Sequence, residues 1–277
     1  MALRVESISY QYGAHQTAVL KNLSLEILPG RWGLLGRNGC GKTTLLRVLM
    51  GLYRPQKGGI FWRGQPLSYQ RATLNQWRRH IGLVFQDPEQ QLVAGTVQED
   101  LSYGLCNLGL TAAEIAPRLR QALEDFDLLA LADAPVHTLS LGEKKRLAIA
   151  DVMILEPQIL LLDEPTAYLD PQQVNNLLTL LQNLYLKGTT LIIASHDLDF
   201  IYEWADGLWV MANGQIQLSG SVPALFHHPQ SQAQLQALGL GLPRQVHFKN
   251  QLQKAIEPWQ GTKAEAFLRR VLGELLI

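Results

Sequence analysis

A glycine-rich octapeptide, residues 36–43 with the sequence Gly-Arg-Asn-Gly-Cys-Gly-Lys-Thr, most restricts what this chain can fold into. It fits the pattern G-x-x-x-x-G-K-[ST], in which the glycines allow backbone N–H groups to curl around a phosphate. A short apolar run, residues 32–35, precedes it, and the apolar spacing of residues 44–52 predicts a helix after it. A helix N-terminus in that place favours an anion. The order strand, glycine loop, helix therefore predicts a phosphate-binding site.

A second pattern supplies carboxylates for the same site. The apolar run of residues 159–162 ends at Asp163 and Glu164, and such a run is typical of a strand buried on both faces. In nucleoside triphosphatases with a phosphate loop, a carboxylate in this position holds the metal. We therefore expect Lys42 to contact the β- and γ-phosphates, Thr43 and Asp163 to bind Mg²⁺, and Glu164 to polarise the attacking water. The alternative is that the two carboxylates belong to a solvated loop.

Composition excludes several classes of protein. Of the 277 residues, 47% are hydrophobic and 17% are charged, which argues against disorder. Lys plus Arg and Asp plus Glu both number 24, so the formal net charge is zero, and we expect no nucleic-acid partner. Two cysteines are too few for a disulfide framework. The sequence has neither an apolar signal segment at its start nor an apolar run long enough to span a membrane, so we expect a soluble, cytosolic chain.

The pattern along the chain predicts an α/β protein with a P-loop nucleoside-triphosphatase core. The first thirty residues have the alternation of antiparallel strands, and residues 92–149 are mainly helical, with a capping box at Thr111 and Glu114. Asn213-Gly214 predicts a hairpin between two short strands. We expect an ATPase domain over residues 1–220, with an inserted helical subdomain at about 87–155. A small, mainly helical C-terminal domain follows at 221–277, where residues 263–276 predict an amphipathic packing helix.

Further motifs in chain order resemble those of the ATP-binding-cassette (ABC) ATPases. Residues 139–143, Leu-Ser-Leu-Gly-Glu, resemble the signature motif, and Asp163 follows at the short spacing of that family. Gln86 resembles the Q-loop glutamine, residues 167–170 resemble the D-loop, and His196 resembles the switch histidine. Tyr12 matches the aromatic residue that stacks on adenine, with Tyr10 as the alternative. The resemblance covers most of residues 1–220.

The resemblance implies that ATP is bound and hydrolysed, with Mg²⁺, between two such chains in a head-to-tail dimer. The catalytic residues would be Glu164 as general base, His196 as the contact to the γ-phosphate and water, and Gln86 as the sensor of metal and membrane partner. The metal ligands would be Thr43, Gln86 and Asp163. The nucleotide contacts would be Tyr12, Gly36, Asn38, Gly39, Cys40, Gly41, Lys42, Thr43, Thr44, Ser140, Gly142 and Asp170.

Two positions depart from the family pattern. Leu141 stands where the signature usually has glycine, and we expect its side chain to turn away from the nucleotide. Cys40 lies inside the phosphate loop, where small residues are usual, and we expect it to act as a small filler. The alternative for Cys40 is a thiolate switch beside the phosphates.

One branch of the family is indicated by the segment after Gln86. Residues 84–92 (Val-Phe-Gln-Asp-Pro-Glu-Gln-Gln-Leu), 95–100 and 107–110 are similar to those of the energy-coupling-factor importers, including the cobalt and nickel ATPase components. That similarity implies a groove that grips helices of a transmembrane coupling protein, and a separate substrate-capture membrane protein. It also implies a second ATPase subunit, identical or a related paralogue, and a peripheral place on the cytoplasmic face of the membrane.

Other functions remain open from the sequence. The motifs are shared by the ATPases of other ABC importers and exporters. A soluble ABC ATPase of translation or DNA repair would need two cassettes, a long coiled-coil insertion or a basic surface, and none of these is present. A P-loop kinase or GTPase would leave residues 140–143 and His196 unexplained. The transported substrate cannot be read from this chain.

Overall fold

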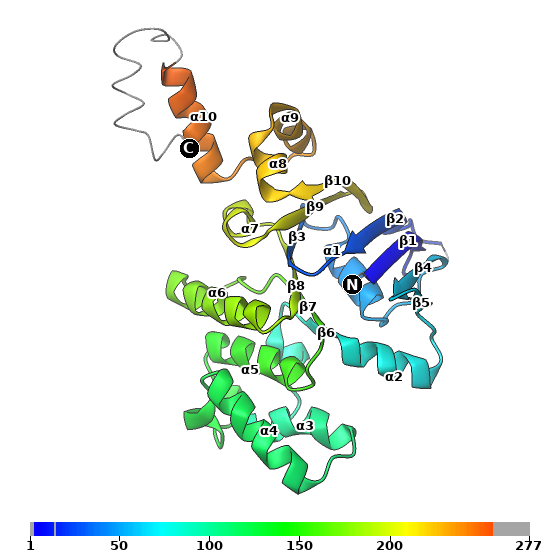
Figure 1. Ribbon diagram of the computed structural model, residues 1–277, viewed down its shortest axis with the longest axis vertical. Helices are drawn as coiled ribbons and strands as arrows, with labels where there is room; N and C mark the ends of the chain where they lie inside the picture. The colour runs from blue at the N-terminus through cyan, green and yellow to red at the C-terminus, as the bar shows by residue number, and fades with distance from the viewer. Residues whose placement is uncertain (1–2, 14, 257–277) are drawn as a thin grey trace.

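The computed structural model describes residues 3–13 and 15–256, which form ten strands and ten α-helices (Figure 1). The strands are β1 (Leu3–Tyr10), β2 (Leu20–Ile27), β3 (Arg31–Leu35), β4 (Lys57–Trp62), β5 (Gln65–Pro66), β6 (Ile81–Val84), β7 (Ile159–Asp163), β8 (Thr190–Ser195), β9 (Gly207–Ala212) and β10 (Gln215–Ser221). The helices are α1 (Lys42–Leu49), α2 (Arg71–His80), α3 (Val97–Asn107), α4 (Ala112–Asp125), α5 (Leu141–Met153), α6 (Pro171–Leu186), α7 (Leu198–Trp204), α8 (Val222–His227), α9 (Pro229–Ala237) and α10 (Arg244–Ile256). The α/β class is confirmed, while α2 was not predicted.

Six strands form the central sheet, in the order β10-β9-β3-β8-β7-β6. Neighbouring strands from β9 to β6 are parallel, and β10 joins β9 as an antiparallel hairpin through the predicted Asn213-Gly214 turn, where both residues have positive φ. Along β7, Leu160 and Leu162 pack into one apolar core, and Ile159 and Leu161 pack into a second. Both faces of this strand are covered, which explains its continuous apolar sequence.

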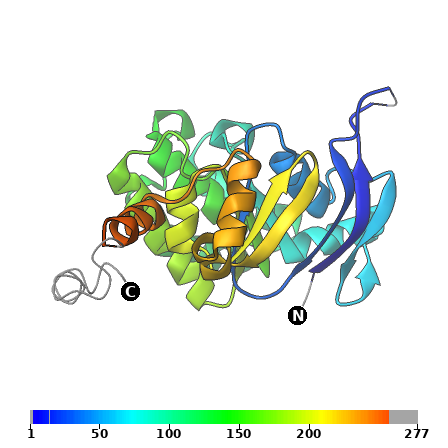
Figure 2. The same ribbon diagram turned by 90° about the horizontal axis from the view of Figure 1, so that it is seen from above.

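A second, antiparallel sheet has the strand order β2-β1-β4-β5. Its inward side chains, among them Leu3, Ile8 and Ile60, share one apolar core with Leu46 of α1 and with Leu161 of the central sheet. In Figure 2 this sheet (blue) lies at the opposite end of the molecule from α10. Helix α1 is therefore held from two sides, which makes it a rigid support for the glycine loop at its N-terminus.

Helices α3, α4 and α5 gather at one side of the central sheet, in the lower part of Figure 1. Each begins with a Ser or Thr that forms a capping box with a Glu three residues later: Thr96 and Glu99, Thr111 and Glu114, Ser140 and Glu143. A capping box satisfies backbone N–H groups that a helix start leaves unpaired. The capping box predicted at Thr111 is confirmed.

Helices α8 to α10 follow the last strand, which ends at Ser221. Phe226, Leu235 and Val246 from these helices belong to the same apolar core as Leu208 of β9. A separate C-terminal domain from residue 221 stays a prediction, and residues 263–276 lie outside the described part of the chain. Among residues 3–13 and 15–256, none of the helices has the length and apolar character needed to cross a membrane.

Candidate nucleotide site

The predicted site residues follow the carboxyl ends of four neighbouring parallel strands. The glycine loop follows β3, His196 follows β8, Asp163 ends β7, and Gln86 lies two residues after β6. These strands stand in the order β3-β8-β7-β6, so their carboxyl ends meet at one edge of the sheet. That edge is the usual ligand site of open parallel sheets. Residues far apart in sequence are thereby brought together.

A cleft of about 780 Å³ lies at this edge. Most of the predicted site residues line it: Tyr12, Asn38, Gly39, Gly41, Lys42, Thr43, Thr44, Gln86, Asp163, Glu164 and His196. The remaining ones, Gly36, Cys40, Ser140, Gly142 and Asp170, do not line it. The cleft is also lined by Val19, Ala167 and Tyr168, for which the sequence predicted no nucleotide contact.

The backbone of the glycine loop depends on two glycines. Gly41, at the N-terminus of α1, has φ 111°, a left-handed conformation that side chains resist. A Cβ atom on Gly36 would lie 2.5 Å from the carbonyl oxygen of Met211 and 2.6 Å from Cys40 Sγ, so only glycine fits there. Lys42 folds back over the loop, and its Nζ donates to the Gly36 carbonyl at 2.7 Å. Its ammonium is thus held at the centre of the loop.

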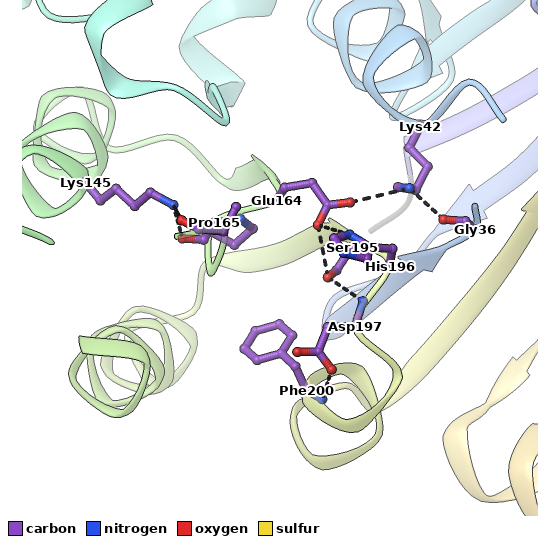
Figure 3. Close-up of polar contacts among 10 residues, drawn as sticks. Gly36, Lys42, Lys145, Glu164, Pro165, Ser195, His196, Asp197 and Phe200 are labelled. Atoms are coloured by element: carbon purple, nitrogen blue, oxygen red, sulfur yellow. Dashed lines mark hydrogen bonds and ion pairs between the residues drawn. The ribbon is translucent and has the colours of Figure 1, made fainter. Parts of the chain in front are cut away.

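Glu164 follows β7, and its carboxylate contacts residues that follow β3 and β8 (Figure 3). Its Oε1 lies 3.5 Å from Lys42 Nζ, and its Oε2 lies 2.9 Å from His196 Nδ1. The Ser195 hydroxyl donates to the same Oε2 at 3.3 Å. Glu164 is buried, at 7% exposed, and has φ 46°, so its backbone is in the left-handed region that is costly for a residue with a side chain. Strain of this kind concentrates at functional sites.

Asp163 provides the observation that bears on a metal ion. Its Oδ1 is buried and has no hydrogen-bond partner in the described part of the chain, while Thr43 forms a side-chain hydrogen bond with its carboxyl group. Burial raises the pKa of this carboxyl. A buried carboxylate oxygen beside a threonine hydroxyl is the donor set that Mg²⁺ uses in P-loop proteins, and Gln86 in the same cleft adds an amide oxygen. The residues therefore fit Mg²⁺.

Tyr12 belongs to an aromatic cluster at the rim of the cleft. Its ring meets Tyr10 and Tyr53 edge to face, with centroids 5.3 and 5.6 Å apart, and its hydroxyl lies 2.8 Å from Thr44 Oγ1. Tyr12 is half exposed, whereas Tyr10 is buried and stacked on Tyr53. Of the two candidates for stacking on a base, Tyr12 is the one with a free ring surface on the cleft.

Three of the predicted residues outside the cleft, Ser140, Gly142 and Asp170, lie at two helix N-termini. Ser140 is the N-cap of α5, where its hydroxyl donates to Glu143 Oε2 at 2.7 Å, and this bond and one from the Ser140 backbone N–H lower the pKa of Glu143. Asp170 is the N-cap of α6 and accepts from Gln173 N at 2.8 Å. A Cβ atom on Gly142 would lie 3.0 Å from the Gln173 side chain. These three residues therefore lie at the starts of α5 and α6, and none of them lines the cleft of the same chain.

Cys40 does not line the cleft. It lines a neighbouring pocket with Arg37, Met211 and Leu238, and it is half-buried. Burial raises the pKa of the Cys40 thiol, against the opposing effect of Lys42. A raised pKa disfavours the thiolate, so the structure supports the filler role and not the thiolate switch.

The structure also identifies a buried lysine for which the sequence predicted no role. Lys145 on α5 is 5% exposed, and its Nζ donates to the carbonyls of Pro165 at 2.7 Å and Ala167 at 2.6 Å (Figure 3). Burial lowers the pKa of Lys145 to about 8. No local signal in the sequence distinguishes Lys145 from its neighbour Lys144.

Comparison with known proteins defines the class to which this fold and site belong. The ABC transporter family matches residues 20–167. A Nostoc protein named by family alone, as an ABC transporter ATP-binding protein, is 52% identical over 87% of both chains. The energy-coupling factor transporter ATP-binding protein EcfA of Methanocaldococcus jannaschii is 39% identical over 86% of this chain and 85% of its own. The solved structure of CbiO1 from Clostridium perfringens, described as part of the ABC transporter complex CbiONQ, is 38% identical, with TM-score 0.76, over 90% of this chain and 98% of that one.

The chain belongs to the ABC transporter ATPase family. It is an ATP-binding and ATP-hydrolysing protein, and its relatives include energy-coupling and cobalt-importer ATPase subunits. The fold predicted from the glycine loop and the motifs after it is thereby confirmed.

Proposed function

We propose that this chain is the ATP-hydrolysing subunit of an energy-coupling-factor type importer, which drives uptake of a micronutrient such as a vitamin or a cobalt or nickel ion. The observation that carries the proposal is the similarity to CbiO1 and EcfA over most of the chain, at 38% and 39% identity. In such an assembly the chain would be a peripheral subunit on the cytoplasmic face of the membrane. ATPase subunits of other ABC importers or exporters are the competing class.

The cleft supports in-line hydrolysis of ATP. Lys42 and the N–H groups of the loop would hold the β- and γ-phosphates, and Tyr12 would stack on the base. Glu164 would accept a proton from the attacking water, and His196, 2.9 Å from it, would hold that water and the γ-phosphate. Thr43, Gln86 and Asp163 would hold Mg²⁺, which when bound neutralises charge on the phosphates. Positioning and charge neutralisation supply most of the rate in such reactions.

The site is incomplete within one chain, which supports a dimer. Ser140 and Gly142 stand at the N-terminus of α5, where the helix dipole favours an anion, yet they do not line the cleft of their own chain. A second subunit placed head to tail would bring its own Ser140 and Gly142 against the γ-phosphate. That subunit would be either an identical chain or a related paralogue.

The segment after Gln86 supports a membrane partner. Glu89 projects from it with 69% of its side chain exposed and pairs with Lys144 Nζ at 2.6 Å, which ties the segment to the start of α5. Val93 (68% exposed) and Tyr103 (56% exposed) add apolar surface nearby in sequence. Exposed apolar side chains are typical of a surface that binds another protein where they gather into one patch. We propose that this surface receives helices of the transmembrane coupling protein.

Affinity purification of the tagged chain from detergent-solubilised native membranes tests the proposal. We expect recovery of a coupling membrane protein and a small substrate-capture protein, and the identity of the latter would define the cargo. Glu89→Lys should lose this recovery while ATP hydrolysis by the isolated chain continues, and Glu124→Lys, at an exposed surface pair, is the matched control. Recovery of two ordinary permease subunits instead would contradict the energy-coupling assignment and leave the ATPase chemistry intact.

A further inference from the structure

Lys145 is a buried cation that the chemistry described above does not use. It lies on α5 with 5% of its surface exposed, and both hydrogen bonds of its ammonium go to carbonyl oxygens of one loop, those of Pro165 and Ala167. Removing an ammonium group from water is costly unless partners replace the water. Two short charge-assisted hydrogen bonds are strong partners. Through these two bonds Lys145 links α5 to that loop.

That loop, residues 164–169, carries the proposed catalytic base at its start and two lining residues of the cleft at Ala167 and Tyr168. Its backbone is strained at both ends, because Glu164 has φ 46° and Tyr168 has φ 64°. The left-handed conformation is costly for a residue with a side chain. It persists only where surrounding contacts oppose relaxation.

The two carbonyls bonded to Lys145 lie between the two strained residues. Pro165 directly follows Glu164, and Ala167 directly precedes Tyr168. Hydrogen bonds within the loop, from Ala167 N to Glu164 O at 3.1 Å and from Leu169 N to Thr166 O at 3.2 Å, make local turns. The start of the loop is tied to β8 by a bond from Glu164 N to Ala194 O at 2.8 Å, and Lys145 holds the residues that follow. Figure 3 shows the Lys145 side chain reaching across to the loop beside Glu164. Lys145 thus pins the strained segment from outside.

We infer that Lys145 is a positioning residue for ATP hydrolysis, which acts by holding the loop of residues 164–169 so that Glu164 is aimed at the water and the γ-phosphate. Its own side chain does not line the cleft, so it acts through Glu164 and not on the nucleotide. The inference rests on the proposed role of Glu164. Because Lys145 and Ser140 share the start of α5, the same contact also ties the catalytic loop to the signature motif of the same chain.

The test is a comparison of Lys145→Met with the parent in steady-state ATP hydrolysis by the full chain. Methionine keeps an unbranched side chain of similar length but has no N–H donor. We expect kcat to fall at least about tenfold while KM for ATP and the affinity for a fluorescent ATP analogue stay within about twofold, the pattern of an interaction needed only in the transition state. Lys187→Met, which removes an exposed surface lysine paired with Asp125, is the matched control and should leave kcat near the parent value.

A double-variant cycle separates positioning from general destabilisation. If Lys145 acts through Glu164, adding Lys145→Met to Glu164→Gln should lower the residual turnover no further, because residues acting as a unit are not additive. If Lys145→Met yields no folded protein, Lys145→Gln is measured in its place with the same expectation, since the shorter, uncharged amide cannot bridge both carbonyls. A kcat within about threefold of the parent, a parallel loss of ATP affinity, or additive losses in the cycle would each overturn the inference. Normal turnover by Glu164→Gln alone would instead overturn the base assignment on which it rests.

Discussion

His196 Nδ1 lies 2.9 Å from Glu164 Oε2, although the two residues follow different strands and stand 32 positions apart in the chain. The parallel pairing of β7 with β8 places Asp163 beside Ala194, so the residues that follow each strand end come into contact. Lys42 reaches the other oxygen of the same carboxylate from the glycine loop. One carboxylate thereby joins three motifs that the sequence keeps far apart.

Glu164→Gln should lower turnover to a small residual rate and preserve ATP binding. The amide cannot accept the proton from water, and general base catalysis commonly contributes about 10²- to 10⁴-fold. Steady-state hydrolysis measures the first effect, and size-exclusion chromatography with ATP should show a persistent dimer. Glu124→Gln, in an exposed pair with Arg120, is the control. Hydrolysis by Glu164→Gln near the parent rate would show that another group is the base.

Lys42→Ala should weaken ATP binding at least about tenfold, because a charge-assisted hydrogen bond to phosphate contributes about 1.5–3 kcal/mol. Titration with a fluorescent ATP analogue measures the affinity. Lys57→Ala, an exposed lysine on β4, serves as the control. Unchanged affinity in Lys42→Ala would contradict the assignment of the glycine loop to the phosphates.

Gly36→Ala should destabilise the protein by about 1–3 kcal/mol, the usual cost of an added group in a packed site. The new Cβ would lie 2.5 Å from the Met211 carbonyl, and backbone cannot move aside as a side chain can. Urea unfolding measures the change. Gly220→Ala is the matched control, since the nearest atom to its Cβ would be at 3.6 Å. Equal stability of the two variants would disprove the close approach.

Asp151 should make stability depend on pH. Burial, together with the charge of Asp100, raises the pKa of Asp151 to about 7 from 3.8, while a hydrogen bond from Gln91 opposes the shift. The folded state therefore holds a proton that the unfolded state releases, so stability is full below about pH 4 and is lost as the pH rises to about 7. The slope is at most about 1.4 kcal/mol per pH unit.

Asp151→Asn removes this titration, so its unfolding free energy relative to the parent should rise between pH 5 and pH 7. Urea unfolding at a series of pH values measures the difference. Asp125→Asn is the comparison, because Lys187 lowers the pKa of Asp125 and its contribution is lost only at more acid pH. A difference for Asp151→Asn that stays constant from pH 5 to pH 7 would refute the shifted pKa.

Cys40 should react with iodoacetamide more slowly than Cys106 at pH 7.5. Cys106 is exposed, whereas burial of Cys40 raises the pKa of its thiol and lowers the thiolate fraction. Mass spectrometry of a labelling time course measures both sites. Cys40→Ser should retain ATP hydrolysis. Faster labelling of Cys40 than of Cys106 would contradict the filler role and support a thiolate switch at Cys40.

Local sequence was enough to predict the fold class, the glycine loop, the carboxylates at the end of β7, one capping box and one hairpin turn. These are local features, because each depends on residue types within a few positions. The conformational preferences of such residues do not depend on the rest of the fold. It also placed the signature, D-loop and switch residues by resemblance, because their order along the chain is readable without coordinates.

Which of these residues meet depends on the folding of the whole chain. The strand order β3-β8-β7-β6 brings Lys42, Glu164 and His196 into one cleft and leaves Ser140 and Asp170 outside it. The conformational preferences of neighbouring residues do not determine this strand order. The same holds for Lys145, because nothing in the run Lys144-Lys145-Arg146 indicates which lysine is buried. Burial and non-local hydrogen bonding are properties of the packed molecule. Packing makes Lys145 the anchor of a strained loop, while its neighbour Lys144 pairs with Glu89.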